Sequence, residues 1–202
     1  MDPLYFATSN VGKVNTLGLK FGDYPVNLKQ YKMDIPEPQE NDVKKVASFK
    51  ILYAFERIKA PCVTLDAGFF IPALGGWPGA FVSQIMGNPS LGPAFIANAV
   101  YSFNGGVVPF FKAKHCLTYM DDTLREPMVF YDELQGIVAP KPQGKREPWH
   151  WSDLPQIMVI ETFGDGTKTL AELTKEEFKS WTDKVGNYGC QSQFVDWYKN
   201  RK

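Results

Sequence analysis

The stretch PLYFATSNVGK, residues 3–13, decides the fold. Its apolar half, Pro3 to Ala7, predicts a short strand, and the small polar residues after it predict a loop that leads into a helix. Asn10 or Ser9 is suited to cap that helix, because a side-chain oxygen there can accept a backbone N–H that has no partner within the helix. The chain therefore starts with a predicted strand–loop–helix unit.

The loop of this unit also has the features of an anion site. Backbone N–H groups at a helix start point outward, and the helix dipole favours negative charge there. Thr8 and Asn10 add side-chain donors, and Lys13 adds a positive charge one turn into the helix. The loop predicts phosphate binding, although an ordinary strand–loop–helix junction can have the same pattern.

Strand and helix patterns alternate through the rest of the chain. Strand patterns cover Tyr24–Tyr31, Pro61–Leu65, Val107–Met120 and Pro127–Ala139, and helix patterns cover Asp42–Ile58, Leu91–Phe103, a short segment after the capping box of Thr174 and Glu177, and Gln191–Arg201. In the longest helix, Val46, Phe49 and Tyr53 recur at helical spacing, with Ile51 and Leu52 beside them. This alternation predicts an α/β protein with a mixed sheet. We see no linker between independent domains, so we expect one domain over residues 1–202.

Composition excludes several classes of protein. The 202 residues include 22 basic and 22 acidic side chains, and zero net charge argues against a protein that grips long nucleic acid. No apolar run has the length of a membrane span, and the first residues lack the pattern of a signal peptide. Cys62, Cys116 and Cys190 are widely spaced and have no Cys-x-x-Cys pattern. We expect them to be reduced, small apolar residues in a cytoplasmic protein.

Two further segments are candidates for chemistry. Asp66 follows the apolar run Pro61–Leu65, and a rigid strand end beside small residues is a frequent place for a metal-binding or catalytic acid. The alternative for Asp66 is a turn cap. Gly75, Gly76 and Gly79 permit a backbone with positive φ, which suits either a close approach to a ligand or a tight hairpin.

Three segments of the sequence form a more specific signal of function when they are taken together than each does alone. They are Thr8-Ser9-Asn10-Val11-Gly12-Lys13, Asp66-Ala67-Gly68-Phe69 and Ala73-Leu74-Gly75-Gly76-Trp77-Pro78-Gly79. In this order and spacing they resemble the Ham1/inosine triphosphate pyrophosphatase family, and the resemblance continues through residues 35–39, Lys50, 130–140 and 169–177. Members of that family hydrolyse non-canonical purine nucleoside triphosphates, such as ITP, dITP and XTP, to the monophosphate and pyrophosphate.

The resemblance implies a fold, a site and a cofactor. The implied fold is α/β, with an elongated central mixed sheet flanked by helices, a nucleotide cleft between two lobes, and a homodimer. Asp66 matches the catalytic and metal-binding acid, with Mg²⁺ as the implied metal and Mn²⁺ as an alternative. The substrate-binding residues at the phosphate end are Thr8, Ser9, Asn10, Lys13, Lys50 and Ala67.

At the metal end the chain departs from the family pattern. The family has acids where this chain has Thr16, Lys45 and Leu65. Two features of the sequence could compensate for these missing acids. Glu37, Glu40 or Asp42 could replace the missing helix acid, or Lys45 could supply positive charge directly to the phosphates.

The end that contacts the base has changed as well. Trp149-His150-Trp151-Ser152-Asp153 matches an aromatic-Gly-aromatic-Asp-Pro segment, and Thr182-Asp183-Lys184 matches Ser-His-Arg. Stacking of Trp149 or Trp151 on a base is worth about 1–3 kcal/mol. Lys184 lacks the donor fork of Arg. His150 stands where the family has Gly, and Phe178, beside Lys179, where it has Lys, so we expect a reshaped base pocket.

Three hypotheses follow. The first is a nucleoside triphosphate pyrophosphatase with altered base specificity. The second is a catalytically impaired nucleotide-binding homologue that lacks a full metal site. The third is single-stranded nucleic-acid binding through residues 141–151, which interleave Lys and Arg with Trp. Zero net charge disfavours the third, and a solvated loop beside the nucleotide cleft is the simpler interpretation of that segment.

Overall fold

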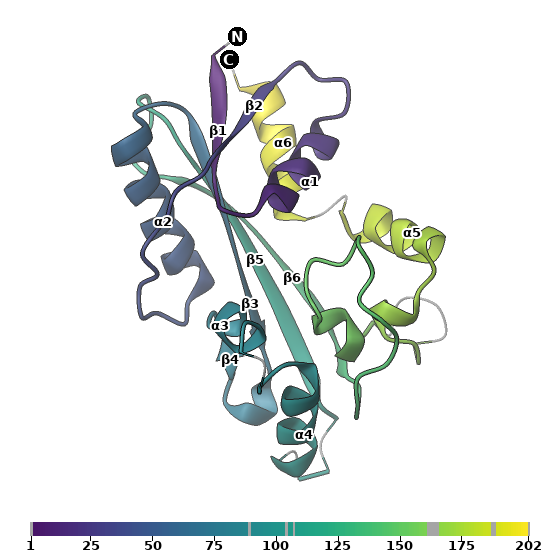
Figure 1. Ribbon diagram of the computed structural model, residues 1–202. Coiled ribbons are helices and arrows are strands. Elements are labelled where there is room, and N and C mark those ends of the chain that lie inside the picture. The colour runs from purple at the N-terminus through teal and green to yellow at the C-terminus, as the bar shows by residue number, and fades with distance from the viewer. Residues whose placement is uncertain are drawn as a thin grey trace. The chain divides into compact units, whose positions relative to one another are not determined.

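A computed structural model describes residues 2–88, 90–103, 105–106, 108–160, 166–186 and 189–201 (Figure 1). The strands are β1 (Pro3–Ala7), β2 (Asn27–Tyr31), β3 (Cys62–Phe70), β4 (Pro78–Gly79), β5 (Phe110–Met120), β6 (Met128–Val138) and β7 (Met158–Val159). The α-helices are α1 (Val11–Phe21), α2 (Val43–Ile58), α3 (Val82–Met86), α4 (Pro93–Phe103), α5 (Lys175–Gly186) and α6 (Cys190–Asn200). Short 3-10 helices are η1 (Pro72–Leu74), η2 (Leu154–Ile157) and η3 (Leu170–Glu172).

The strands form one mixed sheet in the order β2-β1-β3-β5-β6-β7, and β4 pairs with β3. Strand β1 is parallel to both β2 and β3, whereas β4 is antiparallel to β3 and β7 is antiparallel to β6. A parallel pair needs a crossover, and helix α1 supplies the one between β1 and β2. The prediction of an α/β protein with a mixed sheet flanked by helices is confirmed.

The chain divides into two compact units. Unit 1 contains Met1–Ala67, His115–Asp132 and Gly186–Lys202, and unit 2 contains Gly68–Lys114 and Glu133–Val185. Strands β3, β5 and β6 each contribute residues to both units. Each unit therefore consists of segments that are distant in sequence, and the expectation of a single domain stays a prediction.

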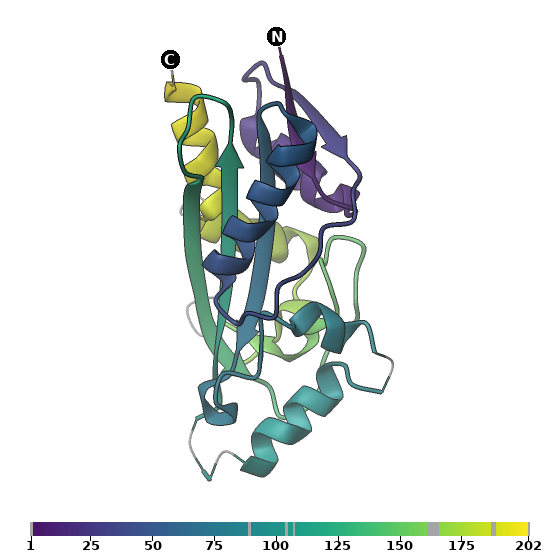
Figure 2. The ribbon, with the colours of Figure 1, turned by 90° about the vertical axis from the view of Figure 1, so that its left-hand side faces the viewer.

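In unit 1, helices cover both faces of the sheet. Leu4 and Phe6 of β1 belong to a buried cluster with α1 and α6, to which Phe21 and Phe194 contribute. Ile51 of α2 packs on the opposite face with residues of β3 and β5. Figure 2 shows α2 beside these strands. Because strand side chains alternate between faces, neighbouring residues of β3 point toward different helices.

Unit 2 has its own core. Phe69, Phe111 and Ile157 are fully or almost fully buried there, together with residues of α4, η3 and α5. The rings of Phe69 and Phe111 are stacked, with centroids 4.8 Å apart. This core joins residues of β3, β5 and β6 to the helical segments that follow β3 and β6 along the chain.

Several local predictions are confirmed. Asn10 caps α1 by accepting the backbone N–H two residues ahead. Asp42, where the sequence analysis began the next helix, caps α2 in the same way, a role that the sequence analysis did not assign to it. Thr174 and Glu177 form the capping box before α5. All three cysteines are buried and free. Gly75, Gly76 and Gly79 have φ of 63°, 89° and 61°, so this turn does use the conformations that glycine permits.

Other details differ from the sequence analysis. The strand expected over Pro61–Leu65 continues to Phe70, because Phe69 and Phe70 pair with β4, so Asp66 lies in mid-strand and not at a strand end. Phe49 and Leu52 of α2 are exposed, and small residues, Ala47 and Ala54, occupy the buried face instead. The predicted start of the next strand, Val107, lies outside the described residues.

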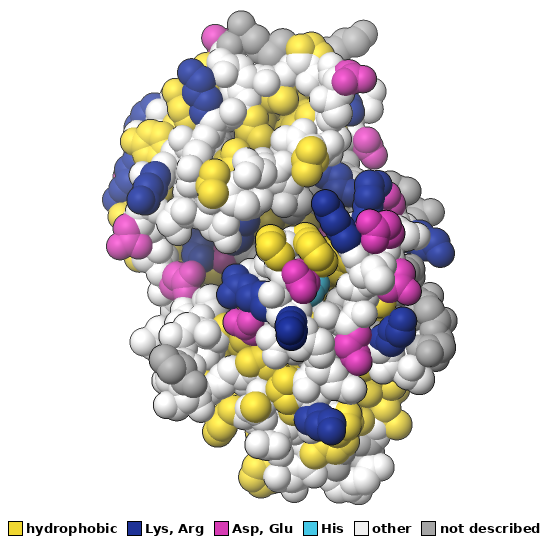
Figure 3. Space-filling view, turned by 45° about the vertical axis from the view of Figure 1, so that its right-hand side comes forward, with side chains coloured by type: hydrophobic (Ala, Val, Ile, Leu, Met, Phe, Trp, Pro, Cys, Tyr) yellow, Lys and Arg dark blue, Asp and Glu magenta, His cyan; other side chains and the backbone are white. Residues whose placement is uncertain are grey.

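The charged side chains are mixed. On the face that Figure 3 shows, Lys and Arg lie among Asp and Glu and do not gather into one basic area. Within the described ranges, no helix is both long enough and apolar enough to cross a membrane.

Candidate functional site

The loop between β1 and α1 is ordered by its own polar side chains. Asn10 Oδ1 accepts the backbone N–H of Gly12 at 2.9 Å, and Thr8 Oγ1 accepts that of Asn10 at 3.1 Å. Thr16, where the family has an acid, donates from Oγ1 to the Gly12 carbonyl at 2.9 Å. Ser9 is exposed on this loop. The helix start is therefore preformed, as an anion site requires.

Asp66 faces α2, as the alternation along β3 dictates. Lys50 of α2 donates from Nζ to Asp66 Oδ1 at 2.7 Å and to Glu37 Oε1 at 2.6 Å. The Lys50 and Asp66 side chains are 12% and 13% exposed, so little water screens this pair. Burial disfavours the charge on Lys50, but Asp66 and Glu37 outweigh burial and raise the pKa of its ammonium group. Lys50 is therefore firmly protonated.

Lys13 approaches the same strand from α1. Its Nζ donates to the Leu65 carbonyl at 2.7 Å. Burial lowers the pKa of Lys13, and the nearby charge of Lys50 lowers it further, while Asp66 and Glu37 act in the opposite direction. Lys13 lies in the first turn of α1 and Lys50 in the middle of α2, and two positive charges close enough to affect one another favour a polyanion.

The donor set around Asp66 determines how a metal would fit. Asp66 Oδ2 is buried and makes no hydrogen bond among the described residues. Glu37 shares Lys50 with Asp66, whereas Glu40 binds Lys45 at 3.2 Å and Asp42 caps α2. Lys45 is thus exposed and paired with Glu40.

In the described ranges, no group of three His, Cys, Asp or Glu side chains is arranged so that it could hold a metal ion. Mg²⁺ commonly binds through one or two carboxylates together with substrate phosphates and waters. The pair Asp66 and Glu37 therefore fits a metal that arrives with a triphosphate. It does not fit a cage made by protein side chains alone.

The residues expected at the base lie in unit 2. The described rings of Trp149, His150, Trp151, Phe178 and Trp181 form a chain of contacts, which we call the aromatic cluster. The rings of Trp151 and Trp181 are stacked, with centroids 6.2 Å apart, and those of His150 and Phe178 are 5.0 Å apart. His150 is 5% exposed, whereas Trp151 is 48% exposed. One side of the cluster is therefore core and the other is surface.

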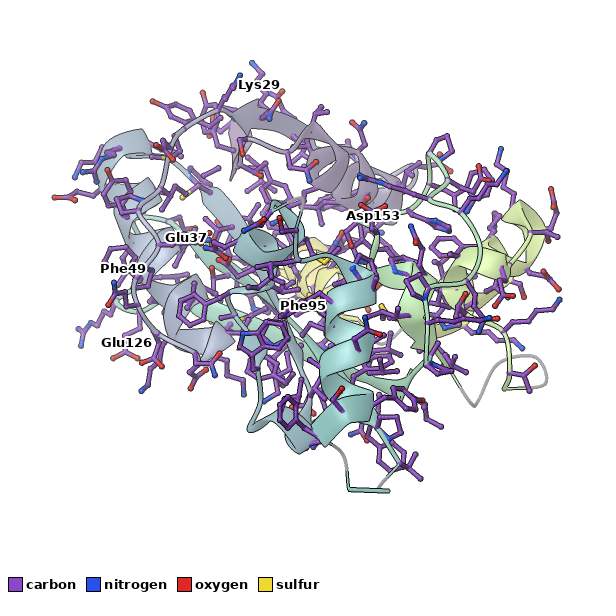
Figure 4. All side chains as sticks on the ribbon, turned by 60° about the horizontal axis from the view of Figure 1, so that its bottom comes forward. Lys29, Glu37, Phe49, Phe95, Glu126 and Asp153 are labelled. Carbon is purple, nitrogen blue, oxygen red and sulfur yellow. The ribbon has the colours of Figure 1, made fainter. Side chains whose placement is uncertain are left out.

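The other expected base-end residues have local roles. Ser152 Oγ accepts the Leu154 backbone N–H at 3.2 Å, at the start of η2. Asp153 forms an ion pair with Arg146 at 3.4 Å. Figure 4 labels Asp153 beside η2 and Glu37 in the segment before α2. Lys184 is exposed in the last turn of α5, and Ala67 is exposed on β3.

The structure thus brings the predicted site residues together in two groups. Lys13, Lys50 and Asp66 form one group in unit 1 with the β1–α1 loop, and the aromatic cluster forms the other in unit 2. The sequence analysis missed Trp181. Its spacing of three residues from Phe178 on one helical face is a signal that could have found it.

The fold and the first group define a class: an α/β protein with a preformed helix start at a strand–loop–helix junction, beside a carboxylate and two lysines. The model of the Ham1 family matches residues 4–184. The chain belongs to the Ham1 family.

Known proteins agree with this assignment. The chain is 26% identical over 208 residues to a dITP/XTP pyrophosphatase of Methanopyrus kandleri, covering 96% of this chain and 95% of that protein. It is 26% identical over 197 residues to a dITP/XTP pyrophosphatase of Thermococcus kodakarensis, covering 97% of each. The solved Ham1 protein of Coxiella burnetii superimposes with a TM-score of 0.77 at 17% identity, over 98% of this chain and 96% of that one.

Proposed function

We propose that this protein is an enzyme, a nucleoside triphosphate pyrophosphatase. It hydrolyses non-canonical nucleoside or deoxynucleoside triphosphates to the monophosphate and pyrophosphate, with a base preference set by an altered pocket. The observation that carries this proposal is the group of Lys13, Lys50 and Asp66 beside the N-terminus of α1. The names of the relatives, dITP/XTP pyrophosphatases, support it.

Each residue of this group has a distinct task. The backbone N–H groups at the start of α1, with Thr8, Ser9 and Asn10, bind phosphate oxygens, and Lys13 and Lys50 neutralise their charge. Asp66 orients a water molecule and accepts its proton as the water oxygen attacks phosphorus. The anhydride bond between the α- and β-phosphates breaks, and its bridging oxygen leaves with pyrophosphate.

Lys50 couples substrate binding to Asp66. Without substrate, its ammonium group is bonded to both Asp66 and Glu37. A triphosphate competes for that ammonium group, so binding draws Lys50 toward the phosphates and weakens its bond to Asp66. The carboxylate then gains basicity at the moment when a water molecule needs to be deprotonated.

Asp66 and Glu37 would hold the divalent metal, Mg²⁺ or Mn²⁺, whose site includes the substrate phosphates. When bound, such a metal supplies positive charge to the phosphate oxygens. The unpaired Asp66 Oδ2 is the oxygen best suited to it.

A second candidate function is nucleotide binding without catalysis. It is favoured by one observation: both carboxylates available for a metal are already bonded to Lys50. Such a protein would keep the phosphate site, bind nucleotides equally well with and without EDTA, and release no pyrophosphate. Single-stranded nucleic-acid binding has less support, because Trp149 and His150 turn into the aromatic cluster and do not form an open stacking platform.

The test is pyrophosphate release from a panel of canonical and non-canonical triphosphates, each with Mg²⁺, Mn²⁺ or EDTA. Metal-dependent release from ITP, dITP or XTP is the expected result. Folded protein that cleaves nothing in the panel would refute the proposal and favour the second candidate. A cytoplasmic location and a homodimer stay predictions from the resemblance, and light scattering on the purified protein measures the latter.

A further inference from the structure

A hydrogen-bonded pair of threonines lies between helix α2 and the sheet in unit 1. The Oγ1 atoms of Thr64 and Thr118 are 2.8 Å apart, and Thr118 Oγ1 donates to the Ala47 carbonyl of α2 at 3.2 Å. Thr64 is 2% exposed, and Thr118 and Ala47 are fully buried. We call Thr64, Thr118 and the Ala47 carbonyl the threonine bridge.

The direction of each bond follows from the atoms involved. A carbonyl oxygen can only accept, so the Thr118 hydroxyl uses its hydrogen on Ala47, and its oxygen accepts from Thr64 Oγ1. A carbonyl in mid-helix keeps a second lone pair after its bond within the helix, so the Ala47 carbonyl can take this extra donor. Thr118 is therefore the residue that connects strands β3 and β5 to α2.

The threonine bridge and the ion pair of Lys50 with Asp66 join the same helix to the same strand. Asp66 is two residues after Thr64, so both side chains point to the α2 face of β3. Lys50 is three residues after Ala47, so both lie on the same side of α2. Helix α2 is thus attached to the sheet at two points that are about one turn apart.

The two attachments differ in stiffness. Lys50 reaches Asp66 through a flexible four-carbon stem, so the 2.7 Å contact between Nζ and Oδ1 does not by itself fix where the helix lies. A threonine side chain is short and stiff, and the Thr118 hydroxyl is bonded directly to helix backbone. The threonine bridge therefore fixes the place of α2 on the sheet, and with it the base of the Lys50 stem.

Stability alone does not account for the threonine bridge. Replacing both partners of a buried hydrogen bond by apolar groups of the same shape is nearly neutral or stabilising, and valine has the shape of threonine. Two valines would lack only the directional bond that holds the helix at one place along the strand. The contribution that is specific to the hydroxyl groups is therefore geometric.

We propose that Thr118 is a positioning residue, whose hydroxyl group holds α2 in the place from which Lys50 meets Asp66. Thr118 acts through Lys50 and not by contact with the substrate. The inference rests on the proposed function, in which Lys50 moves from Asp66 toward the substrate phosphates. A misplacement of about 1 Å in such a group can cost about a hundredfold in rate.

The test compares four variants, each checked for folding by circular dichroism. Thr118→Val removes the bond to Ala47 and takes away the partner of the buried Thr64 hydroxyl. The double variant Thr64→Val/Thr118→Val removes both hydroxyl groups, so neither is left unpaired. Thr118→Ser keeps the hydroxyl and loses a methyl group. Ile51→Val is the matched control, because it removes one carbon from the same helix–sheet interface and keeps the threonine bridge.

Three kinds of measurement are made on each protein. Thermal unfolding gives Tm, and pyrophosphate release from the triphosphate of the panel that is cleaved fastest gives kcat and KM. Brief acetylation of the folded protein, followed by peptide mass spectrometry, gives the rate of modification of Lys50 relative to Lys45. Lys45 is the internal standard, because it lies on the same helix with its side chain 69% exposed.

Stability and turnover should separate. Thr118→Val should lower Tm by about 2–8 °C and kcat by about tenfold, with KM within about twofold of wild type because the β1–α1 loop and Lys13 still bind the phosphates. The double variant should regain most of the Tm and keep the low kcat. Thr118→Ser and Ile51→Val should lower Tm and keep kcat within about twofold.

Acetylation of Lys50 relative to Lys45 should rise in the two variants that lack the Thr118 hydroxyl and stay unchanged in Thr118→Ser and Ile51→Val. Either of two results overturns the inference. One is a kcat that follows Tm, so that the double variant regains full turnover. The other is an acetylation ratio that stays at the wild-type value in the double variant. If Thr118→Val does not fold, the double variant and Thr118→Ser decide by the same criteria.

Failure of the proposed function gives a different pattern. In that case the wild-type protein cleaves no triphosphate of the panel, yet the acetylation ratio still rises when the Thr118 hydroxyl is removed. An unchanged ratio overturns the inference whether or not the protein is an enzyme.

Discussion

At the scale of single residues, the phosphate end is governed by the unequal pairing of the two Asp66 oxygens. Oδ1 is bonded to Lys50, while Oδ2 is buried and makes no hydrogen bond among the described residues. A carboxylate held in this way is oriented by one oxygen and keeps the other available for a metal or a water molecule. The chemistry that we propose for this site therefore depends on the Asp66 side chain.

Asp66→Asn should abolish turnover and spare the fold. The amide keeps the size of the carboxylate but cannot accept a proton, and loss of a general base typically costs about 10²–10⁴ in rate. Pyrophosphate release measures the loss, and thermal unfolding checks the fold. Glu40→Gln is the control, because Glu40 pairs with the exposed Lys45 and not with the site. Full activity in Asp66→Asn would remove Asp66 from the mechanism.

Lys13 should make nucleotide binding sensitive to alkaline pH. Its pKa is lowered, mainly by burial, so it loses its charge below the usual lysine value of 10.5, whereas Lys50, whose pKa is raised, stays charged. Affinity for a triphosphate should therefore fall as pH rises through the lowered pKa of Lys13. Calorimetric titration at several pH values measures this fall.

Lys13→Arg keeps its charge at all of these pH values and should show no such fall. An equal fall in both proteins would assign the effect to another group. The same pKa has a consequence for folding, because the unfolded chain holds this proton up to about 10.5. Between the lowered pKa and that value, Lys13 therefore makes the folded state more stable as pH rises.

At the scale of elements, strand β6 depends on a glycine. A Cβ at Gly136 would lie 2.3 Å from the Val159 carbonyl oxygen and 2.8 Å from the Phe111 ring. Strand β7 pairs directly beside this position, since Ile137 is opposite Val159. The backbone of β7 can approach this closely only because residue 136 has no side chain.

Gly136→Ala should destabilise the protein by about 1–3 kcal/mol, as overpacking in cores does. For a chain of this size, each kcal/mol lowers Tm by about 2–4 °C. Gly18→Ala is the matched control: it lies inside α1, and its Cβ would meet only Leu28, at 3.9 Å. That variant should be slightly more stable, because alanine favours a helix. Equal effects of both changes on Tm would contradict this interpretation.

The elements with local signals could be predicted from the sequence. The N-terminal starts of α1, α2 and α5 follow from Asn10, Asp42 and Thr174, whose side chains accept hydrogen bonds from nearby backbone N–H groups. The extent of β3 could not be predicted, because it depends on pairing with Pro78 and Gly79, a contact distant in sequence. Helix α3 and strand β7 could not be predicted either, because they are too short for a hydrophobic periodicity to be recognised in the sequence and depend on tertiary contacts.

The candidate site could also be predicted only in part. The family resemblance identified Lys13, Lys50 and Asp66 as candidate site residues. The contacts among them could not be predicted from the sequence, because they depend on how the chain folds. We propose Glu37 and not Glu40 as the second acid because Glu37 binds Lys50 whereas Glu40 binds Lys45, and no spacing rule gives these pairings. In the aromatic cluster, His150 Nδ1 accepts the Glu147 backbone N–H at 3.0 Å, a contact that likewise depends on the fold.

At the scale of the whole molecule, we expect a single cooperative unfolding transition. Strands β3, β5 and β6 each pass from one unit to the other, so neither unit keeps all of its strands if the other unfolds. Calorimetry should give one peak whose calorimetric and van't Hoff enthalpies agree, and circular dichroism and tryptophan fluorescence should show the same midpoint. Two resolved transitions would instead define two domains.

The reactivity of the three cysteines can be used to measure unfolding of the native protein. All three are buried in unit 1, and burial raises the pKa of Cys62 and of Cys116 to about 12. Since only an exposed thiolate reacts readily, alkylating reagents should leave the native protein unmodified. A molecule that carries label is then one whose unit 1 has unfolded, so the rate at which molecules become labelled under native conditions measures how often that happens. For the same reason, a cysteine introduced on the surface would be the one thiol to take a probe, without removal of the native three.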